Sequence, residues 1–521
     1  MTAVNLFIDG DWCAGAGGER RSFFDPATGE ETGTVAKAEA EDVDRAVTSA
    51  ARGFDVWRRW SAFDRARLLR RAAQALRDAA DTIAPLITAE QGKPLHEARG
   101  EVMFAAEVTD WFGDEGQRAY GRIIPARDAR VSAAALVEPA GVVAGLSPWN
   151  YPVGQAVRKI AIALAAGCPI VLKAPEETPA SVAAMVECFA SAGLPAGVLN
   201  LLFGDPPMIS DRLIRHPEVR VISFTGSTVV GRRLAAVAGE SLTRSVMELG
   251  GHAPALVFAD ADVGDACDTL ARDKFHNAGQ ACISPTRLLV QDGVFAEFLA
   301  RFAGHATRLK VGSGTEAGID MGPLANARRR DAIDALIGDA VAQGATLVTG
   351  GIRPKGHGYF YPPTILSDVP VSARIMNEEP FGPVAIVNRF FDPDEAFAEA
   401  NRLDYALAAY GFSYDSVTIR RLETGIRSGM VSINHNGLGV PEVPFGGVRD
   451  SGFGDEGGLE AMREMMVTRF VSTRHQGKDA WRLPFSARPG RTCQSRTSRS
   501  LNRRRTRCSS ASPRPASATA I

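Results

Sequence analysis

The stretch GVVAGLSPWN, residues 141–150, opens a run of short apolar segments separated by helical patterns. Similar segments return as PIVLKAP (169–175), VLNLLFG (198–204) and VISFTGS (221–227). Each is too short for a helix and is bounded by glycine, proline or polar residues, which is typical of buried parallel strands. The alternation predicts an α/β fold whose parallel sheet is covered on both faces. In such folds ligands bind at the carboxyl ends of the strands.

Other patterns flank this central region. Residues 40–118 are predicted to be mainly helical, with the clearest apolar period over 64–82. Residues 119–140 alternate in polarity, which predicts an extended hairpin. A second β/α region runs from about 248 to 440, and TRFVST (468–473) is predicted to be a final edge strand.

Composition excludes several classes of protein. The chain has 521 residues, 45% hydrophobic and 23% charged, which fits two to four globular domains. No apolar run reaches the ~18 residues of a membrane span. The first ten residues lack a basic segment and an apolar core, so we expect no secretory signal and a cytoplasmic protein. The seven cysteines show no metal-binding spacing, so free thiols and no metal are expected.

The net charge of −1 conceals a basic C-terminal tail. Residues 475–521 contain ten Arg and one Lys against a single Asp. This tail could be an arm for nucleic acid. Because it has too few apolar residues to form a core, a disordered extension without a nucleic-acid partner is favoured.

The segment FHNAGQACISPTR, residues 275–287, places Cys282 in a glycine-containing turn. A lone cysteine is a weak signal, because most free cysteines are small core residues. A nucleophilic thiolate also needs an oxyanion donor and a proton acceptor. Asn150 in PWNYP, at the end of a predicted strand, offers an amide donor. Glu248 in MELGGHAP offers a carboxylate as general base.

Two further segments suit a dinucleotide. FTGSTVVG (224–231) puts Gly226 and Ser227 at a strand-to-helix turn, where backbone N–H groups can bind a pyrophosphate. KAPEETP (173–179) ends a predicted strand with Lys173 and Glu176. A carboxylate near the adenosine ribose favours NAD over NADP.

PWNYP, KAPEETP, FTGSTVVG, ELGG, GQACISPTR, EEPFGPV and PFGGVRDSGFG occur in this order. Together they resemble the aldehyde dehydrogenase superfamily from about residue 5 to 473. The resemblance implies a Rossmann-type cofactor domain, an α/β catalytic domain and a β oligomerisation arm, in homodimers or homotetramers. The implied ranges are 1–118 and 139–247 for the cofactor domain, 248–440 for the catalytic domain, 119–138 and 455–474 for the arm, and 475–521 for the tail.

The resemblance also implies roles for single residues. Cys282 would be the nucleophile, Glu248 the general base, and Asn150 with the Cys282 N–H the oxyanion site. The implied NAD contacts are Pro148, Trp149, Lys173, Glu176, Gly226, Ser227, Glu379 and Phe381. Relatives that pass the acyl group to coenzyme A characteristically lack the Glu248 carboxylate, so release of a free acid is expected.

For the substrate, the chain looks most like the succinate-semialdehyde dehydrogenase branch. Arg158 matches an arginine that binds the substrate carboxylate there. A second arginine is replaced by His276, and a serine by Gly439 or Val440. The sequence therefore favours succinate semialdehyde, oxidised to succinate, and leaves another small aliphatic or aromatic aldehyde as the alternative. A catalytically silent scaffold or a thiol esterase is the alternative of another class.

Overall fold

The computed structural model describes residues 2–476 of the chain. They belong to two compact units. One contains the residues up to 122 and from 134 to 471, and the other contains residues 123–133 and the chain from Ser472. Across residues 2–476, no helix is long and apolar enough to cross a membrane. The basic C-terminal tail, predicted to be a disordered extension, lies almost entirely outside the described residues.

The larger unit contains an eight-stranded sheet in the order β22-β12-β11-β8-β9-β10-β2-β3. Its central strands are those predicted from the apolar segments, and β12, β11, β8, β9 and β10 pair in parallel. The α/β prediction is therefore confirmed. The strands are β2 Leu6–Ile8, β3 Asp11–Cys13, β8 Val142–Leu146, β9 Ile170–Lys173, β10 Leu199–Leu202, β11 Val219–Thr225, β12 Arg244–Glu248 and β22 Gly452–Phe453.

Eight helices belong to this half of the unit. They are α1 Ala40–Trp57, α2 Ala62–Asp78, α3 Ala80–Gln91, α4 Leu95–Glu115, α5 Pro152–Ala166, α6 Pro179–Ser191, α7 Pro206–Arg215 and α8 Thr228–Glu240. The helical pattern expected over 64–82 is divided at Ala79, which ends α2 and begins α3. Ile83 and Ile87 are buried on α3. Every residue of α5 is buried, and the helix ends at Gly167, whose φ of 92° suits glycine.

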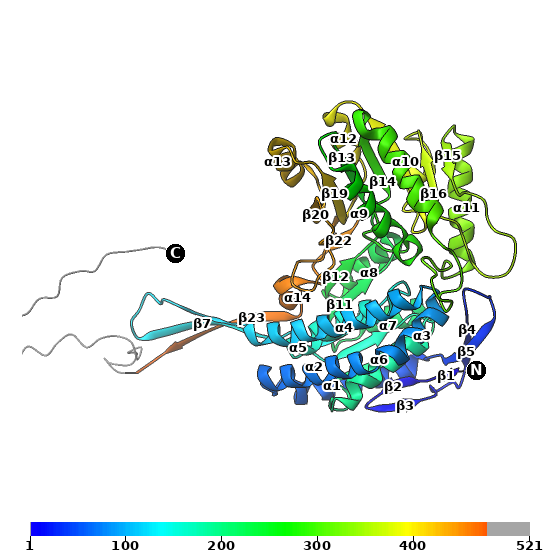
Figure 1. Cartoon of the computed structure of the whole chain (residues 1–521). Coiled ribbons are helices and arrows are strands. Elements are labelled where there is room, and N and C mark those ends of the chain that lie inside the picture. The colour runs from blue at the N-terminus through cyan, green and yellow to red at the C-terminus, as the bar shows by residue number, and fades with distance from the viewer. Residues whose placement is uncertain (1, 477–521) are drawn as a thin grey trace, which may run out of the picture. The chain divides into compact units, whose positions relative to one another are not determined.

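A seven-stranded sheet in the order β15-β16-β17-β14-β13-β19-β20 forms the second half of the unit. Figure 1 shows α9, α10 and α11 beside its strands. The strands are β13 Pro254–Val257, β14 Arg287–Gln291, β15 Thr346–Thr349, β16 Thr364–Ser367, β17 Val384–Phe390, β19 Ala408–Phe412 and β20 Met430–Ile433. The helices are α9 Val263–Phe275, α10 Asp292–Arg308, α11 Ala327–Ala342, α12 Pro393–Ala400 and α13 Ser416–Gly425.

Smaller elements complete the described chain. A three-stranded sheet has the order β1-β5-β4, and a two-stranded sheet joins β18 and β21. The segments expected as a hairpin and a final edge strand form a sheet in the order β23-β7-β6. Its predicted role in oligomers stays a prediction. The bounds are β1 Thr2–Val4, β4 Arg20–Phe24, β5 Glu31–Ala36, β6 Arg122–Ile124, β7 Val131–Pro139, β18 Tyr405–Ala406, β21 Val448–Arg449, α14 Gly458–Glu464 and β23 Met466–Arg474.

Candidate functional site

Cys282 follows a short turn with an unusual backbone. Asn277, Ala278 and Gly279 have φ values of 51°, 52° and 69°. A Cβ on Gly279 would lie 2.2 Å from the Gly382 carbonyl oxygen, so the close approach requires glycine. The Asn277 N–H donates to Glu97 Oε2 (2.9 Å). This left-handed turn is therefore held in place from α4, where Glu97 lies.

The Asn150 side chain lies against the same turn. Its Nδ2 donates to the Gln280 carbonyl oxygen (3.1 Å). The Asn150 carbonyl oxygen accepts from Lys93 Nζ (3.0 Å) and from Asn277 Nδ2 (2.9 Å). One N–H of the Asn150 amide thus fixes its orientation, and the second N–H remains available to another acceptor.

Glu248 is the last residue of β12, with 2% of its surface exposed. Neither carboxylate oxygen has a hydrogen-bond partner within the described part of the chain. Burial, reinforced by the negative charge of Glu456, raises the pKa of Glu248 well above its usual value. In its ionised form, a carboxylate with a raised pKa is a stronger base toward water.

A buried ion pair lies near Glu248. Lys159 Nζ contacts Glu456 Oε1 and donates to Ser223 Oγ (3.0 Å) and Thr225 Oγ1 (2.7 Å). Its positive charge opposes the effect of Glu456 on the Glu248 carboxyl. The charges of Lys159 and Glu456 therefore shift the pKa of the candidate base, Glu248, in opposite directions. The sequence prediction omitted both.

Cys282, Arg158 and His276 line one cavity of about 910 Å³. Burial raises the pKa of the Cys282 thiol to about 12, with Glu379 and Glu248 adding to the shift. Arg158 opposes it. The predicted nucleophile and the two predicted substrate residues thus share one cavity, and Glu248 influences it through its charge.

The Arg158 guanidinium is buried, 4% exposed, and is already partly engaged. It donates to the carbonyl oxygens of Glu456 (2.8 Å) and Gly439 (2.5 Å). Its carbon lies 5.3 Å from the Phe104 ring centre and 4.8 Å from that of Phe445. Two of its five N–H groups bind the protein, and three remain for a ligand.

His276 presents a neutral ring to the cavity. Its Nδ1 lies 3.0 Å from the Tyr151 hydroxyl, and the two rings are stacked. Burial lowers the pKa of His276 to about 4, with the positive charge of Lys93 adding to the effect. At neutral pH it therefore adds no positive charge to the cavity, at the position where the resemblance implied that a second arginine is replaced.

The predicted adenosine-ribose residues lie apart from this cavity. Lys173 ends β9 and pairs with Glu176 Oε1 (2.7 Å), which also accepts from the Gly204 N–H (3.0 Å). Gly226 follows β11, and Ser227 is the N-cap residue of α8 without a side-chain cap bond. These groups lie at the carboxyl ends of parallel strands.

The predicted nicotinamide residues come from both halves of the unit. Glu379 Oε1 accepts from the Gly251 N–H (2.9 Å), and burial raises the pKa of Glu379 to about 7. Phe381 has a φ of 47° and meets Trp149 edge to face, with ring centres 5.6 Å apart. Pro148 precedes Trp149 in the segment after β8. The structure thus brings the 148–149 segment against Phe381.

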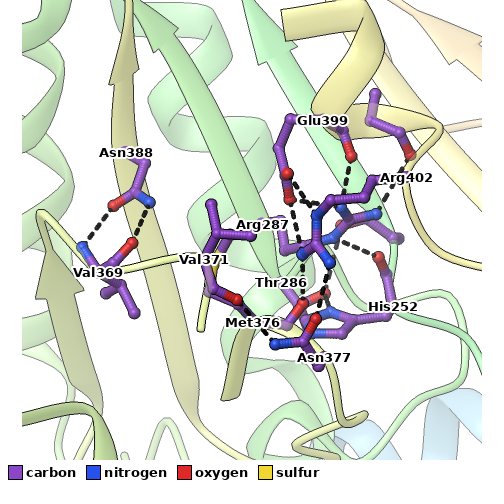
Figure 2. Close-up of polar contacts among 12 residues, drawn as sticks. His252, Thr286, Arg287, Val369, Val371, Met376, Asn377, Asn388, Glu399 and Arg402 are labelled. Carbon is purple, nitrogen blue, oxygen red and sulfur yellow. Dashed lines mark hydrogen bonds and ion pairs between the residues drawn. The ribbon is translucent and has the colours of Figure 1, made fainter. Parts of the chain in front are cut away.

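A polar network ties together the segments that carry Glu248, Cys282 and Glu379 (Figure 2). Arg287, fully buried, donates to the His252 carbonyl oxygen (3.1 Å) and pairs with Glu399 (2.9 Å). Arg402 pairs with the same Glu399 (2.6 Å) and donates to the Met376 carbonyl oxygen (3.0 Å). The segments are therefore fixed against one another a few residues from each functional side chain.

The His252 ring completes this network. Its Nε2 lies 2.8 Å from the Ile375 carbonyl oxygen, which can only accept, so Nε2 carries the proton. Its Nδ1 then accepts from the Thr286 hydroxyl (2.6 Å). Burial, with the nearby Arg287 charge, lowers the pKa of His252 well below its usual value. These contacts give His252 a structural role between the segments that carry Thr286 and Ile375.

Known proteins resemble the chain over most of its length. The aldehyde dehydrogenase family model matches residues 12–471. A putative 4-(hydroxymethyl)benzenesulfonate dehydrogenase of Comamonas testosteroni is 44% identical, covering 89% of this chain and 97% of its own. A succinate-semialdehyde dehydrogenase of Escherichia coli (strain K12), whose name specifies NADP(+), is 38% identical, covering 90% and 98%.

A solved structure agrees in fold as well as in sequence. The crystal structure of succinate-semialdehyde dehydrogenase from Burkholderia pseudomallei has a TM-score of 0.89 and 40% identity, covering 90% of this chain and 98% of that one. Family match, relatives and fold agree. The chain belongs to the aldehyde dehydrogenase family and is an oxidoreductase.

Proposed function

We propose that this protein oxidises an aldehyde bearing an acidic group to the free carboxylic acid, with NAD as hydride acceptor and Cys282 as nucleophile. The main support for this proposal is that Cys282 and the buried Arg158 line one cavity. An aldehyde carbon at the sulfur and an acid group at the guanidinium use both groups at once. Charge-assisted hydrogen bonds of this kind contribute about 1.5–3 kcal/mol.

Each side chain of the candidate site has a separate role in the proposed reaction. The Cys282 thiol first loses its proton to solvent, and the thiolate Sγ then attacks the carbonyl carbon. The free N–H of Asn150 and the Cys282 N–H stabilise the oxyanion. NAD, when bound, accepts the hydride that leaves this carbon. The product is a thioester on Cys282. Glu248 then takes a proton from water, the hydroxide adds to the thioester, and the carboxylic acid leaves as the thiolate is restored.

The residues present fit a dinucleotide. The first turn of α8 has no side-chain cap, so its N–H groups are free for a pyrophosphate. A Cβ on Gly250 would lie 2.7 Å from Glu379 Oε2, so glycine keeps the space around this carboxylate open. Lys173 and Glu176 would hold the adenosine ribose. Because Lys173 and Gly204 fix the Glu176 carboxylate, it would repel a 2′-phosphate, which supports NAD over NADP.

Two observations support an acidic group in the substrate. The named substrates of the two relatives above carry a sulfonate and a carboxylate. Within the cavity, Arg158 keeps three N–H groups available. Among aldehydes that bear an acidic group, succinate semialdehyde is the smallest substrate that we propose, and it is the one that the sequence favours. A cavity of about 910 Å³ with the Phe104 and Phe445 rings in its wall also accommodates an aromatic acid aldehyde.

The test is NADH formation at 340 nm by the purified protein with matched aldehydes. Succinate semialdehyde is compared with butanal, and 4-formylbenzenesulfonate with benzaldehyde, each with NAD and with NADP. We expect the acid aldehydes to exceed their neutral partners in kcat/KM by about 10- to 100-fold, the worth of one charge-assisted contact. Equal rates for acid and neutral aldehydes would rule out an acid-binding role for Arg158. A preference for NADP would contradict the role of Glu176.

A further inference from the structure

Gln155 is a polar side chain in the cavity wall for which the described part of the chain offers no side-chain hydrogen bond. It lies on α5, is 7% exposed and lines the same cavity as Cys282. Its Oε1 is fully buried and has no partner among residues 2–476. Leaving such an acceptor unpaired costs about 1–3 kcal/mol, so these groups are rare without a reason.

The position of Gln155 relates it to Arg158. The two residues are three apart on one helix, so their side chains leave the same face about one turn apart. Both line the cavity, where the guanidinium offers only donors and the carboxamide offers a donor and an acceptor. The two side chains thus form a polar strip in a part of the wall that also contains the Phe104 and Phe445 rings.

The two ends of the strip call for different ligand groups. A carboxylate or sulfonate has only acceptors, so it satisfies Arg158 and cannot satisfy Gln155 Oε1. A hydroxyl can donate to Oε1 and accept from the amide N–H. An amide without other partners in a cavity therefore favours a hydroxyl in the ligand.

We propose that Gln155 forms a hydroxyl-binding subsite, and that the preferred substrates are acid aldehydes with a hydroxyl close to the acid group. This inference rests on the proposed function, because it takes the acid group to bind Arg158. Side chains one turn apart on a helix have Cβ atoms about 5–6 Å apart. The hydroxyl is thus expected on the first or second carbon from the acid group.

The experiment compares succinate semialdehyde with its 2-hydroxy and 3-hydroxy derivatives, in the wild type and in Gln155→Met. Methionine keeps the length of the side chain and removes both hydrogen-bonding atoms. The wild type should favour one hydroxylated aldehyde in kcat/KM by about tenfold or more, and Gln155→Met should lose that preference while keeping its rate on succinate semialdehyde. Leu309→Met, elsewhere in the cavity wall, is the matched control and should keep the preference.

The other outcomes overturn the inference in distinguishable ways. If the wild type shows no preference for a hydroxylated aldehyde, the hydroxyl-binding subsite is refuted directly. An equal loss on all three aldehydes in Gln155→Met means that the amide binds the acid group instead. If no aldehyde yields NADH in the wild type, the proposed function fails, and the subsite fails with it. The first two outcomes leave aldehyde oxidation intact.

Discussion

The candidate site and the Arg287 network differ in how many of their buried polar groups have hydrogen-bond partners. Gln155 Oε1 in the cavity wall, and Asn150 Oδ1, Ser284 Oγ and both oxygens of Glu248 in the candidate site, are buried without partners among the described residues. In the network of Figure 2, the nitrogens of Arg287 and Arg402 all donate to oxygen atoms. Since buried polar groups normally find partners, we expect a ligand beside the unpaired groups of the candidate site, and a structural role for the paired groups of the network.

This contrast predicts that substitutions in the two regions affect different properties. Cys282→Ala should lower kcat for aldehyde oxidation by at least about a thousandfold, because it removes the nucleophile. Its unfolding temperature should stay at the wild-type value, since a small side chain at a half-buried position is replaced by another. Steady-state NADH formation and a thermal melt measure the two effects. Substantial residual turnover would place the nucleophile elsewhere.

Arg287→Met should have the opposite effect and lower the free energy of unfolding. Removing the guanidinium leaves three carbonyl oxygens without their donor and Glu399 with Arg402 as its remaining partner. Leaving buried acceptors unpaired costs about 1–3 kcal/mol. Arg374→Met is the matched control, because its pair with Glu378 is solvent-exposed and contributes about 0.5 kcal/mol. Urea unfolding followed by circular dichroism compares them. Similar losses in both variants would refute the scaffold role.

The pH dependence of thioester hydrolysis should reflect the unpaired carboxyl of Glu248. Its pKa is raised by burial, so the protonated, inactive form predominates below the raised pKa and hydrolysis increases as pH increases through it. Well below that pKa the rate should increase about tenfold per pH unit. In Glu248→Gln the hydrolysis rate should be low and nearly independent of pH. A pH-dependent increase that persists in this variant would assign the titration to another group.

The sequence predicted the local elements of the central sheet well. The segments ending at Leu146, Lys173 and Thr225 are strands because apolar runs of this length, bounded by turn residues, are compatible with little else. The break at Ala79 was not predicted, because no glycine or proline marks it and the reason is the tertiary packing of α3.

The candidate site was predictable where one motif carries one side chain. Cys282, Glu248 and Asn150 each lie in a quotable motif, and the fold places the latter two near the Cys282 segment. Contacts between distant segments were not predictable. Lys159 and Glu456 are 297 residues apart in the sequence. The partners of Arg158 are backbone carbonyl groups, which every residue has, so no residue type in the sequence indicates them.

In the proposed reaction Cys282 carries the acyl group and Glu248 releases it. The most direct measurement mixes Glu248→Gln with NAD and succinate semialdehyde and follows both NADH and intact mass. We expect about one NADH per active site, followed by very slow turnover, and an added acyl mass that peptide mapping places on Cys282. Turnover at the wild-type rate, or an acyl group on another residue, would contradict it.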